Sequence, residues 1–177
     1  MKARKPGAKA KLVSIDGVDA STVLAAARLA LGGRGRSGIS HWDASGIFQD
    51  LTVAEEAAGA PSARTLLLLY AADLAFRLRW EIRPALAEGR TVVAAPYVDT
   101  AVALGRAAGV PVGWLTNLFR FAPRPADRRF AKGSRRGAAE GFVGFASERI
   151  EQANGRSRRQ LIDSVAAELR AAEKRST

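Results

Sequence analysis

The segment from Asp16 to Thr22 carries the residue types of a ligand-binding loop. It combines two carboxylates and a glycine with the hydroxyl pair Ser21-Thr22, between an apolar run at 12–15 and an alanine- and leucine-rich run at 21–31. A strand, a tight turn and a helix in this order aim the first backbone N–H groups of the helix at the turn, where they can bind a phosphate. The candidate nucleotide-binding residues in this segment are Asp16, Gly17, Asp19, Ser21 and Thr22.

Basic side chains form a second candidate site. The net charge of +11 arises entirely from residues 1–11 and 120–136, and the rest of the chain is neutral. This placement favours a polyanion partner such as nucleic acid, with solvated basic tails as the alternative. Phe121 and Phe130 lie among the arginines and could either stack on bases or anchor the segment. The candidate polyanion-binding residues are Arg124, Arg128, Arg129, Lys132, Arg135 and Arg136.

Several kinds of site are excluded by residue types that are rare or absent. The chain has no cysteine and one histidine, His41, so neither a disulfide nor a thiolate or histidine-based metal site is expected. No apolar run reaches the roughly 18 residues of a membrane span, and the basic start lacks the apolar region of a signal peptide. We therefore expect a soluble, cytoplasmic protein without a membrane partner, with a disordered basic arm at 1–11 and a single domain at 12–177.

The spacing of apolar residues predicts the elements that must position these side chains. Strands are expected at 12–15, 39–42 and 91–95, and helices at 21–31, 62–87, 100–108, 112–121 and 140–154, before a C-terminal helix that starts with a capping box of Ser157 and Gln160. Residues 123–137 have proline, glycine and arginine in place of an apolar period, which predicts a basic loop or flap. Strands that alternate with helices favour an α/β fold with a parallel sheet.

The helix expected at 62–87 has apolar residues on nearly every face of its first half. A helix of this kind is buried on several sides, by the core or by a second subunit. Pro84 lies near its end, where it would kink or terminate the last turn. A charged substitution at an outward position of this helix, such as Leu67 if that residue faces out, should then weaken assembly.

Four segments carry, in order, motifs of one enzyme family. Residues 81–100 contain I-R-P-A-L, a glycine turn and V-V-A-A-P-Y-V-D-T, and residues 69–73 read L-Y-A-A-D. Residues 15–19 read I-D-G-V-D, and residues 114–125 end in R-P. The chain resembles the thymidylate kinases, P-loop nucleoside monophosphate kinases whose motifs include E-G-x-D-G, L-F-A-A-D-R, V-V-x-D-R-Y-x-x-S and R-P-D. The resemblance covers about residues 12–125 and implies a P-loop kinase-like parallel sheet flanked by helices, trimmed in its C-terminal third.

The resemblance also implies roles for particular residues. It places Tyr70 where the family stacks an aromatic ring on the base, although a core tyrosine is the alternative, and it places Tyr97 at the tyrosine of D-R-Y. It implies a homodimer, or a heteromer with a substitute partner, through helix 62–87. The arginines of 123–137 fall near the lid that closes over ATP in the family. The family's fourth strand is matched only by Arg-Arg-Phe-Ala at 128–131, which puts that strand in doubt.

Four departures from the family motifs concern the groups that handle phosphate and base. The P-loop pattern G-x-x-x-x-G-K-[ST] is shortened here, since the hydroxyl pair comes three residues early and the lysine is absent. Ala95-Pro96 replaces the Asp-Arg of D-R-Y, and Leu74 replaces the base-reading arginine. The arginine after the second strand is missing from Ser40–Gly46, where His41 and Trp42 could bind a ligand or be incidental.

These departures predict a pseudoenzyme with no catalytic residues, acting as a binding or scaffold subunit. No cofactor is expected, and Mg²⁺ and ATP would be needed only if residual kinase activity exists. Two alternatives stay open: an active or weak dTMP or nucleotide kinase whose cationic groups come from elsewhere, such as Arg124 or Arg128, and a basic nucleic-acid-binding protein.

Overall fold

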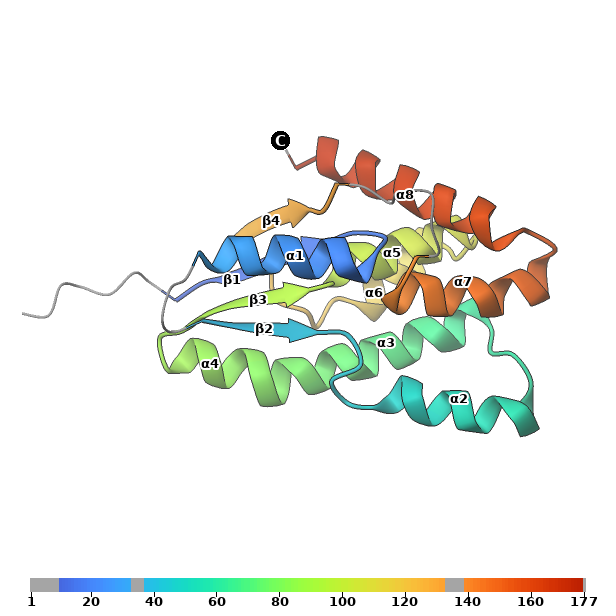
Figure 1. Ribbon diagram of the computed structural model, residues 1–177, viewed down its shortest axis with the longest axis horizontal. Coiled ribbons are helices and arrows are strands. Elements are labelled where there is room, and N and C mark those ends of the chain that lie inside the picture. Colours follow the sequence, from blue (N-terminus) through green and yellow to red (C-terminus); the bar gives the residue numbers. More distant parts are fainter. Residues whose placement is uncertain (1–9, 33–36, 133–138, 177) are drawn as a thin grey trace, which may run out of the picture.

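Parallel strands form the centre of the protein, which is seen here in a computed structural model that describes residues 10–32, 37–132 and 139–176, with the backbone alone for 53–58 and 151–154. The strands in this part of the chain are β1 (Leu12–Asp16), β2 (Ser37–His41), β3 (Thr91–Ala95) and β4 (Asp127–Phe130). They lie in the order β2-β3-β1-β4, and every pairing is parallel. Figure 1 shows the strands running side by side with helices around them. The parallel sheet flanked by helices that the sequence predicts is therefore confirmed.

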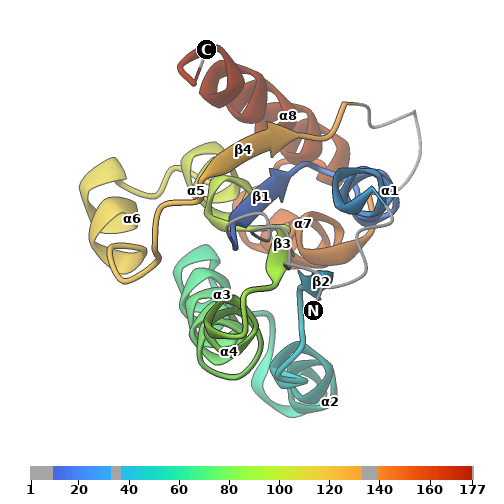
Figure 2. The same ribbon diagram turned by 90° about the vertical axis from the view of Figure 1, so that its left-hand side faces the viewer.

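Helices cover both faces of this sheet. They are α1 (Ala20–Leu31), α2 (Ile47–Ala58), α3 (Ala63–Arg77), α4 (Arg83–Ala87), α5 (Val98–Ala107), α6 (Val112–Leu118), α7 (Gly141–Asn154) and α8 (Arg158–Lys174). Figure 2 shows α1 on one side of the sheet and α3, α5 and α6 on the other. Because strand side chains alternate between faces, Ile15 and Val93 pack against α1 while Val92 and Ala94 join the larger cluster on the opposite face.

Local signals mark the ends of several helices correctly. The side chain of Asp19 accepts a hydrogen bond at the start of α1, and Gly32 ends that helix in the left-handed conformation, with φ of 54°. The predicted capping box of Ser157 and Gln160 is present in full at the start of α8. These ends are set by residues within a few positions of each other, which is why the sequence predicts them.

The long helix expected at 62–87 is one helical run with a change of geometry. It begins after the cap Ser62, and a π-helical turn at Leu78–Ile82 separates α3 from α4. Pro84 lies in the first turn of α4, and the helix continues to Ala87. A proline has no N–H and its ring clashes with the carbonyl of residue i−4, so the wider turn just before Pro84 accommodates it without ending the helix.

The prediction of a loop at 123–137 is wrong for residues 127–130, which form β4. This strand pairs with β1 from Val13↔Asp127 to Asp16↔Phe130, and flanking bonds run from Ala126 N to Leu12 O (2.8 Å) and from Ala131 N to Asp16 O (2.8 Å). It lies at the sheet edge, where exposed Arg128 and Arg129 are tolerated, so the strand needs no apolar period. The fourth strand that the sequence left in doubt is therefore present.

Some sequence predictions concern residues outside the described part. The basic arm is described only at residues 10 and 11, and Arg135 and Arg136 lie outside the described residues. Among the helices that the structure describes, none combines the length and the hydrophobicity that crossing a membrane requires.

Candidate functional site

A buried network at the carboxyl ends of β1 and β3 joins three of the sequence-predicted residues. Asp16 Oδ1 accepts hydrogen bonds from the backbone N–H of Tyr97 (2.9 Å), the backbone N–H of Thr100 (2.9 Å) and Thr100 Oγ1 (2.8 Å). The N–H of Gly17 donates to Thr100 Oγ1 at 3.2 Å. Thr100 is thus the hub that ties the loop after β1 to the start of α5, and all of these groups are buried.

The carboxyl group of Asp16 is held in an unusual state. It has no exposed surface, and its Oδ2 has no hydrogen-bond partner among the residues that the structure describes. Burial, reinforced by the charge of Asp99, raises the pKa of Asp16 to about 7 against the lowering effect of its hydrogen bonds from Thr100 and Tyr97. Asp16 therefore changes its charge near neutral pH, inside the protein.

The N-terminus of α1, where a phosphate was expected to bind, is occupied by the protein itself. The carboxylate of Asp19 accepts from Thr22 N (3.1 Å) and Ser21 Oγ (2.6 Å), and Thr22 Oγ1 donates to the carbonyl of Asp19 (2.9 Å). The N–H of Ala20 donates to the carbonyl of Glu140 at 3.3 Å. Two amides of the first turn of α1, those of Ala20 and Thr22, thus find acceptors in the residue that precedes α7 and in the helix's own cap.

The starts of α1 and α7 are packed against each other. Gly141 has φ of +74°, and a Cβ there would lie 2.8 Å from the Cβ of Ala20. A Cβ on Gly17 would lie 2.6 Å from Cγ2 of Val23. Glycine is therefore required at both positions by close packing, and at Gly141 also by the backbone conformation.

Asp19 carries its negative charge at this helix N-terminus. Partial burial acts to raise its pKa, but the hydrogen bonds from Ser21, Thr22 and the N–H of Glu140 outweigh that effect and hold the pKa below its usual value. A carboxylate near the positive end of the helix dipole is stabilised there. The place that would receive an anion thus already holds one.

A cavity of about 220 Å³ opens beside this loop at the carboxyl end of the sheet. Its walls come from the start of α1, the ends of β2 and β3, and the start of α7, and they are mostly apolar. No lysine or arginine occurs among the described residues that line it, and its polar side chains are His41, Trp42, Thr100 and Glu140. No group of three or more His, Asp or Glu side chains suited to a metal ion is found in the part of the chain that the structure describes.

Tyr70 and Tyr97 lie in the core and do not line this cavity. Tyr70 has no exposed surface, and its hydroxyl donates to the carbonyl of Tyr97 at 2.6 Å. Its ring lies 4.4 Å from that of Phe142, centre to centre. The hydroxyl of Tyr97 donates to the carbonyl of Pro123 at 2.8 Å. The structure therefore presents Tyr70 as a core tyrosine, and its ring is not offered to a ligand.

A buried ionic network beneath the cavity was not predicted from the sequence. Arg77, with no exposed surface, donates to Ser40 Oγ (2.9 Å), Ser40 O (2.7 Å) and Pro96 O (2.9 Å). Asp73, equally buried and 3.9 Å from Arg77, accepts from the backbone N–H groups of Asp43 and Ser45. These bonds position the loop that carries His41 and Trp42. The sequence does contain one signal for this network: Asp73 and Arg77 are four residues apart in an apolar helix, the spacing at which two side chains of a helix meet.

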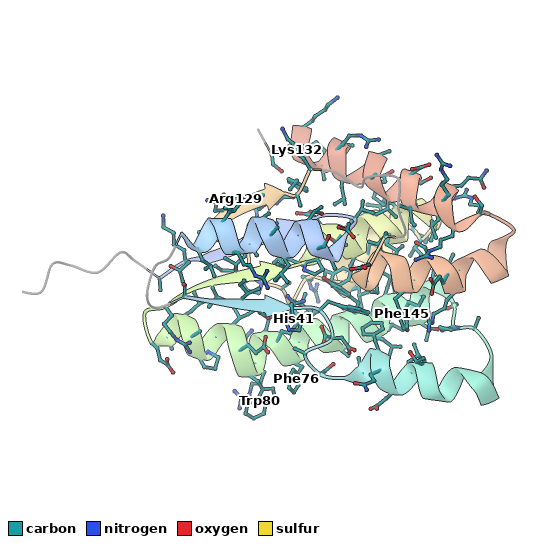
Figure 3. The ribbon with its side chains drawn as sticks, in the orientation of Figure 1. His41, Phe76, Trp80, Arg129, Lys132 and Phe145 are labelled. Atoms are coloured by element: carbon teal, nitrogen blue, oxygen red, sulfur yellow. The ribbon has the colours of Figure 1, made fainter. Side chains whose placement is uncertain are left out.

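Fewer of the basic side chains in residues 120–132 are unpaired than the sequence suggests. Arg128 forms a bidentate ion pair with Asp99 (2.8 Å), and Arg129 pairs with Asp127 (2.7 Å). Arg124 and Lys132 are exposed, and no ion pair is recorded for either within the described residues. Figure 3 shows Arg129 and Lys132 at the upper rim of the molecule, near β4 and α8.

No family model matches this sequence. Over 58 residues, 33% of the chain, it is 41% identical to a protein named probable thymidylate kinase from Pyrococcus horikoshii. It is 40% identical, also over 58 residues, to a probable thymidylate kinase from Pyrobaculum calidifontis. The shared segment covers 28% and 30% of these two relatives, so the chain matches less than a third of their length.

The fold is that of a solved thymidylate kinase. The crystal structure of thymidylate kinase from Ehrlichia chaffeensis matches 96% of this chain and 89% of its own with a TM-score of 0.67. At 12% sequence identity this likeness concerns the fold. Together with the sequence relatives, it confirms the resemblance to thymidylate kinases that the motifs predict.

Proposed function

We propose that this chain is a thymidylate-kinase-like pseudoenzyme that works as a binding or scaffold subunit. One observation carries the proposal: the N-terminus of α1 is capped by the protein itself. Ala20 N donates to the carbonyl of Glu140 (3.3 Å), and Thr22 N donates to the carboxylate of Asp19 (3.1 Å). A phosphate group bound at this place would need those amides.

The electrostatics of the site support the same proposal. Catalysis of phosphoryl transfer rests almost wholly on positioning and on positive groups that stabilise the transferred phosphate. The loop from Asp16 to Thr22 contains two carboxylates and no basic residue, and the described lining of the cavity contains no lysine or arginine. These residues do not fit a magnesium-bound triphosphate, and no phosphoryl-transfer step is assigned to them.

The competing proposal is a kinase whose positive groups come from elsewhere. Arg128 is a weak candidate because Asp99 already holds it at 2.8 Å, whereas exposed Arg124 is free to move. The relatives named probable thymidylate kinase support this alternative, but the match spans less than a third of their length.

The deciding experiment is calorimetric titration of the full chain with dTMP, with ATP and with both in the presence of Mg²⁺, followed by a coupled assay of ADP release. The pseudoenzyme proposal expects no turnover. A rate near the 1 to 100 per second typical of kinases would overturn it. Binding of a nucleotide without turnover would support a binding subunit.

The scaffold role is proposed to use the outer face of α3 and the π-helical turn. Leu68, Phe76 and Trp80 are 52%, 39% and 64% exposed, and exposed Ala72 lies between them on the same face. Figure 3 shows Phe76 and Trp80 pointing away from the body of the molecule. This apolar strip, Leu68–Ala72–Phe76–Trp80, fits a homodimer or a heteromeric partner. Leu67 does not belong to it, because that side chain is fully buried and therefore does not face out.

A further inference from the structure

The cavity beside the loop 16–22 has the character of a site for an uncharged ligand. Val18, Leu24, Pro96, Phe142 and Val143 are among the apolar residues that line it. The carboxyl ends of β2 and β3 and the starts of α1 and α7 surround it, and it is partly open to solvent. Apolar walls of this kind favour an apolar ligand because binding removes apolar surface from water.

The volume sets the size of the ligand. An apolar cavity of about 150 Å³ in another protein holds one benzene molecule. The present cavity has about 220 Å³, which is enough for a bicyclic aromatic molecule of about ten non-hydrogen atoms. Trp42 lies in the wall and within an aromatic cluster, 5.0 Å from Phe48 and 6.1 Å from Phe142 between ring centres. Such rings favour a flat aromatic ligand.

The charges around the cavity disfavour an anion. Glu140 lies in the wall, and the carboxylate of Asp19 caps the adjoining helix α1. No basic side chain among the described lining residues offsets them. Among the described residues, a phosphate ester would therefore find no cation in exchange for its hydration shell, and that exchange is costly in an apolar site.

His41 adds one polar requirement. Its Nδ1 lies 2.8 Å from the carbonyl oxygen of Trp42. A carbonyl only accepts, so this bond requires a proton on Nδ1, and in that tautomer Nε2 is an acceptor. His41 is exposed and lines the cavity at the end of β2 (Figure 3). A ligand with a single O–H or N–H group could donate to this nitrogen.

We propose that the cavity binds an uncharged, flat aromatic molecule of about ten non-hydrogen atoms that donates one hydrogen bond to His41 Nε2. This ligand class rests on the proposed function, since a working phosphate site would require the opposite electrostatics. The site lies beside the loop 16–22, which resembles the opening motif of the family, but its proposed ligand carries no phosphate.

The test is a titration of the full ¹⁵N-labelled chain with 2-naphthol, 2-methoxynaphthalene and 2-naphthyl phosphate, which share one ring system. We expect 2-naphthol to shift the backbone amide signals of Val18, Leu24 and Phe142, and to bind at least about tenfold more tightly than the phosphate. No shift with 2-naphthol up to its solubility limit, or tighter binding of the phosphate, would overturn the inference. Neither result alters the kinase assay, whose outcome decides the proposed function separately.

Two variants locate the ligand. Leu24→Trp fills the cavity from α1 and should weaken 2-naphthol binding at least about tenfold. Leu29→Trp is the matched control, because Leu29 is on the same helix, is 82% exposed and lies outside the cavity. Equal binding by both variants would overturn the location.

His41→Ala changes an exposed side chain and tests the hydrogen bond from the ligand. It should remove the preference for 2-naphthol over 2-methoxynaphthalene, and a retained preference would overturn the role of His41.

Discussion

Two aspartates at the end of β1 illustrate how position decides the behaviour of one residue type. Asp16 is fully buried and has its pKa raised to about 7, whereas Asp19 caps α1 at the surface of the loop and has its pKa lowered. Both stand where the thymidylate kinase motif has acidic residues, yet each serves this chain's own backbone. The two carboxylates therefore stabilise the loop and its neighbouring elements.

The charge state of Asp16 predicts a pH-dependent stability. Its folded pKa of about 7 lies above the unfolded value of 3.8, so the folded state binds more protons between these values. The stabilisation is complete below about pH 4 and is lost as the pH rises through 7. Asp16→Asn keeps an acceptor for Thr100 and Tyr97 without the charge. From pH 5 to pH 8 its advantage over the wild type in the free energy of unfolding in urea should therefore grow by about 3 kcal/mol, because the wild type loses 1.36 kcal/mol per pH unit up to the folded pKa.

A parallel unfolding series on Asp127→Asn serves as the control, since Asp127 is part of a surface ion pair at the sheet edge. The control should follow the pH profile of the wild type. If Asp16→Asn follows that profile as well, Asp16 is not the group responsible.

The cap at Asp19 predicts a difference between two substitutions. Asp19→Ala removes the acceptor of Thr22 N and should lower the free energy of unfolding by about 1 kcal/mol, the usual loss for a helix cap. Asp19→Asn keeps a cap acceptor and should cost only a few tenths of that. Urea denaturation followed by circular dichroism measures both. Equal losses would show that the charge, and not the cap, matters.

At the scale of elements, α3 with its π-helical turn divides its residues between the core and the surface. Leu66, Leu67, Tyr70 and Leu74 are fully buried, while Leu68, Phe76 and Trp80 are exposed. The sequence shows an apolar helix on all sides, but only the packing of α5 and α7 against it identifies the inner face. What remains outside is the strip proposed for assembly.

This division predicts the effect of charged substitutions on assembly. Trp80→Glu should shift the protein towards the monomer in light scattering at micromolar concentration without lowering its unfolding free energy. Leu67→Glu should instead destabilise the fold by several kcal/mol, because it buries an unpaired charge. Leu29→Glu on α1, also highly exposed, is the control and should change neither property. A wild-type monomer at these concentrations would overturn the homodimer and leave only a heteromeric partner for this strip.

At the scale of the whole molecule, the charge of +11 is the feature most relevant to large partners. That net value already counts Asp99 and Asp127, but their ion pairs with Arg128 and Arg129 leave these two arginines less available to a partner. A polyanion would therefore meet Arg120, Arg124 and Lys132 as the more available cations of the described basic segment.

This distinction predicts how salt should affect nucleic-acid binding. Each phosphate neutralised on DNA contributes about −0.9 to the slope of log affinity against log salt. Arg124→Ala and Lys132→Ala should each reduce the slope by about that amount, whereas Arg128→Ala should leave it nearly unchanged. Fluorescence anisotropy at several salt concentrations gives the slopes.

Truncation of residues 1–11 combined with neutralisation of Arg128, Arg129, Arg135 and Arg136 tests the basic segments together. The polyanion hypothesis predicts weaker binding and a smaller slope. Absence of binding by the wild type at low salt, or equally tight binding with the same slope in the variant, would mean that these segments are solvated tails.

The sequence by itself determined the parts of this protein that depend on neighbours along the chain. The strand at 91–95, the cap of α8 and the glycine that ends α1 all follow from residues a few positions apart. The four-segment resemblance likewise predicted the fold, because the order of motifs reflects the order of elements. It could not predict β4, whose pairing with β1 comes from backbone bonds at an edge and not from an apolar pattern.

Only the tertiary structure decided which distant residues contact the loop 16–22. Thr100 reaches Asp16 from 84 residues away, and Glu140 reaches Ala20 across the molecule. In the V-D-T that follows Tyr97, Thr100 places a hydroxyl where the family motif has serine, so the sequence did contain a signal for Thr100. No nearby residue indicated the contact of Glu140 with Ala20. Such contacts depend on how separate helices pack on the sheet, and the periodicity of one helix fixes only which of its faces is buried. That packing turned a loop with the residues of a phosphate site into one that caps itself.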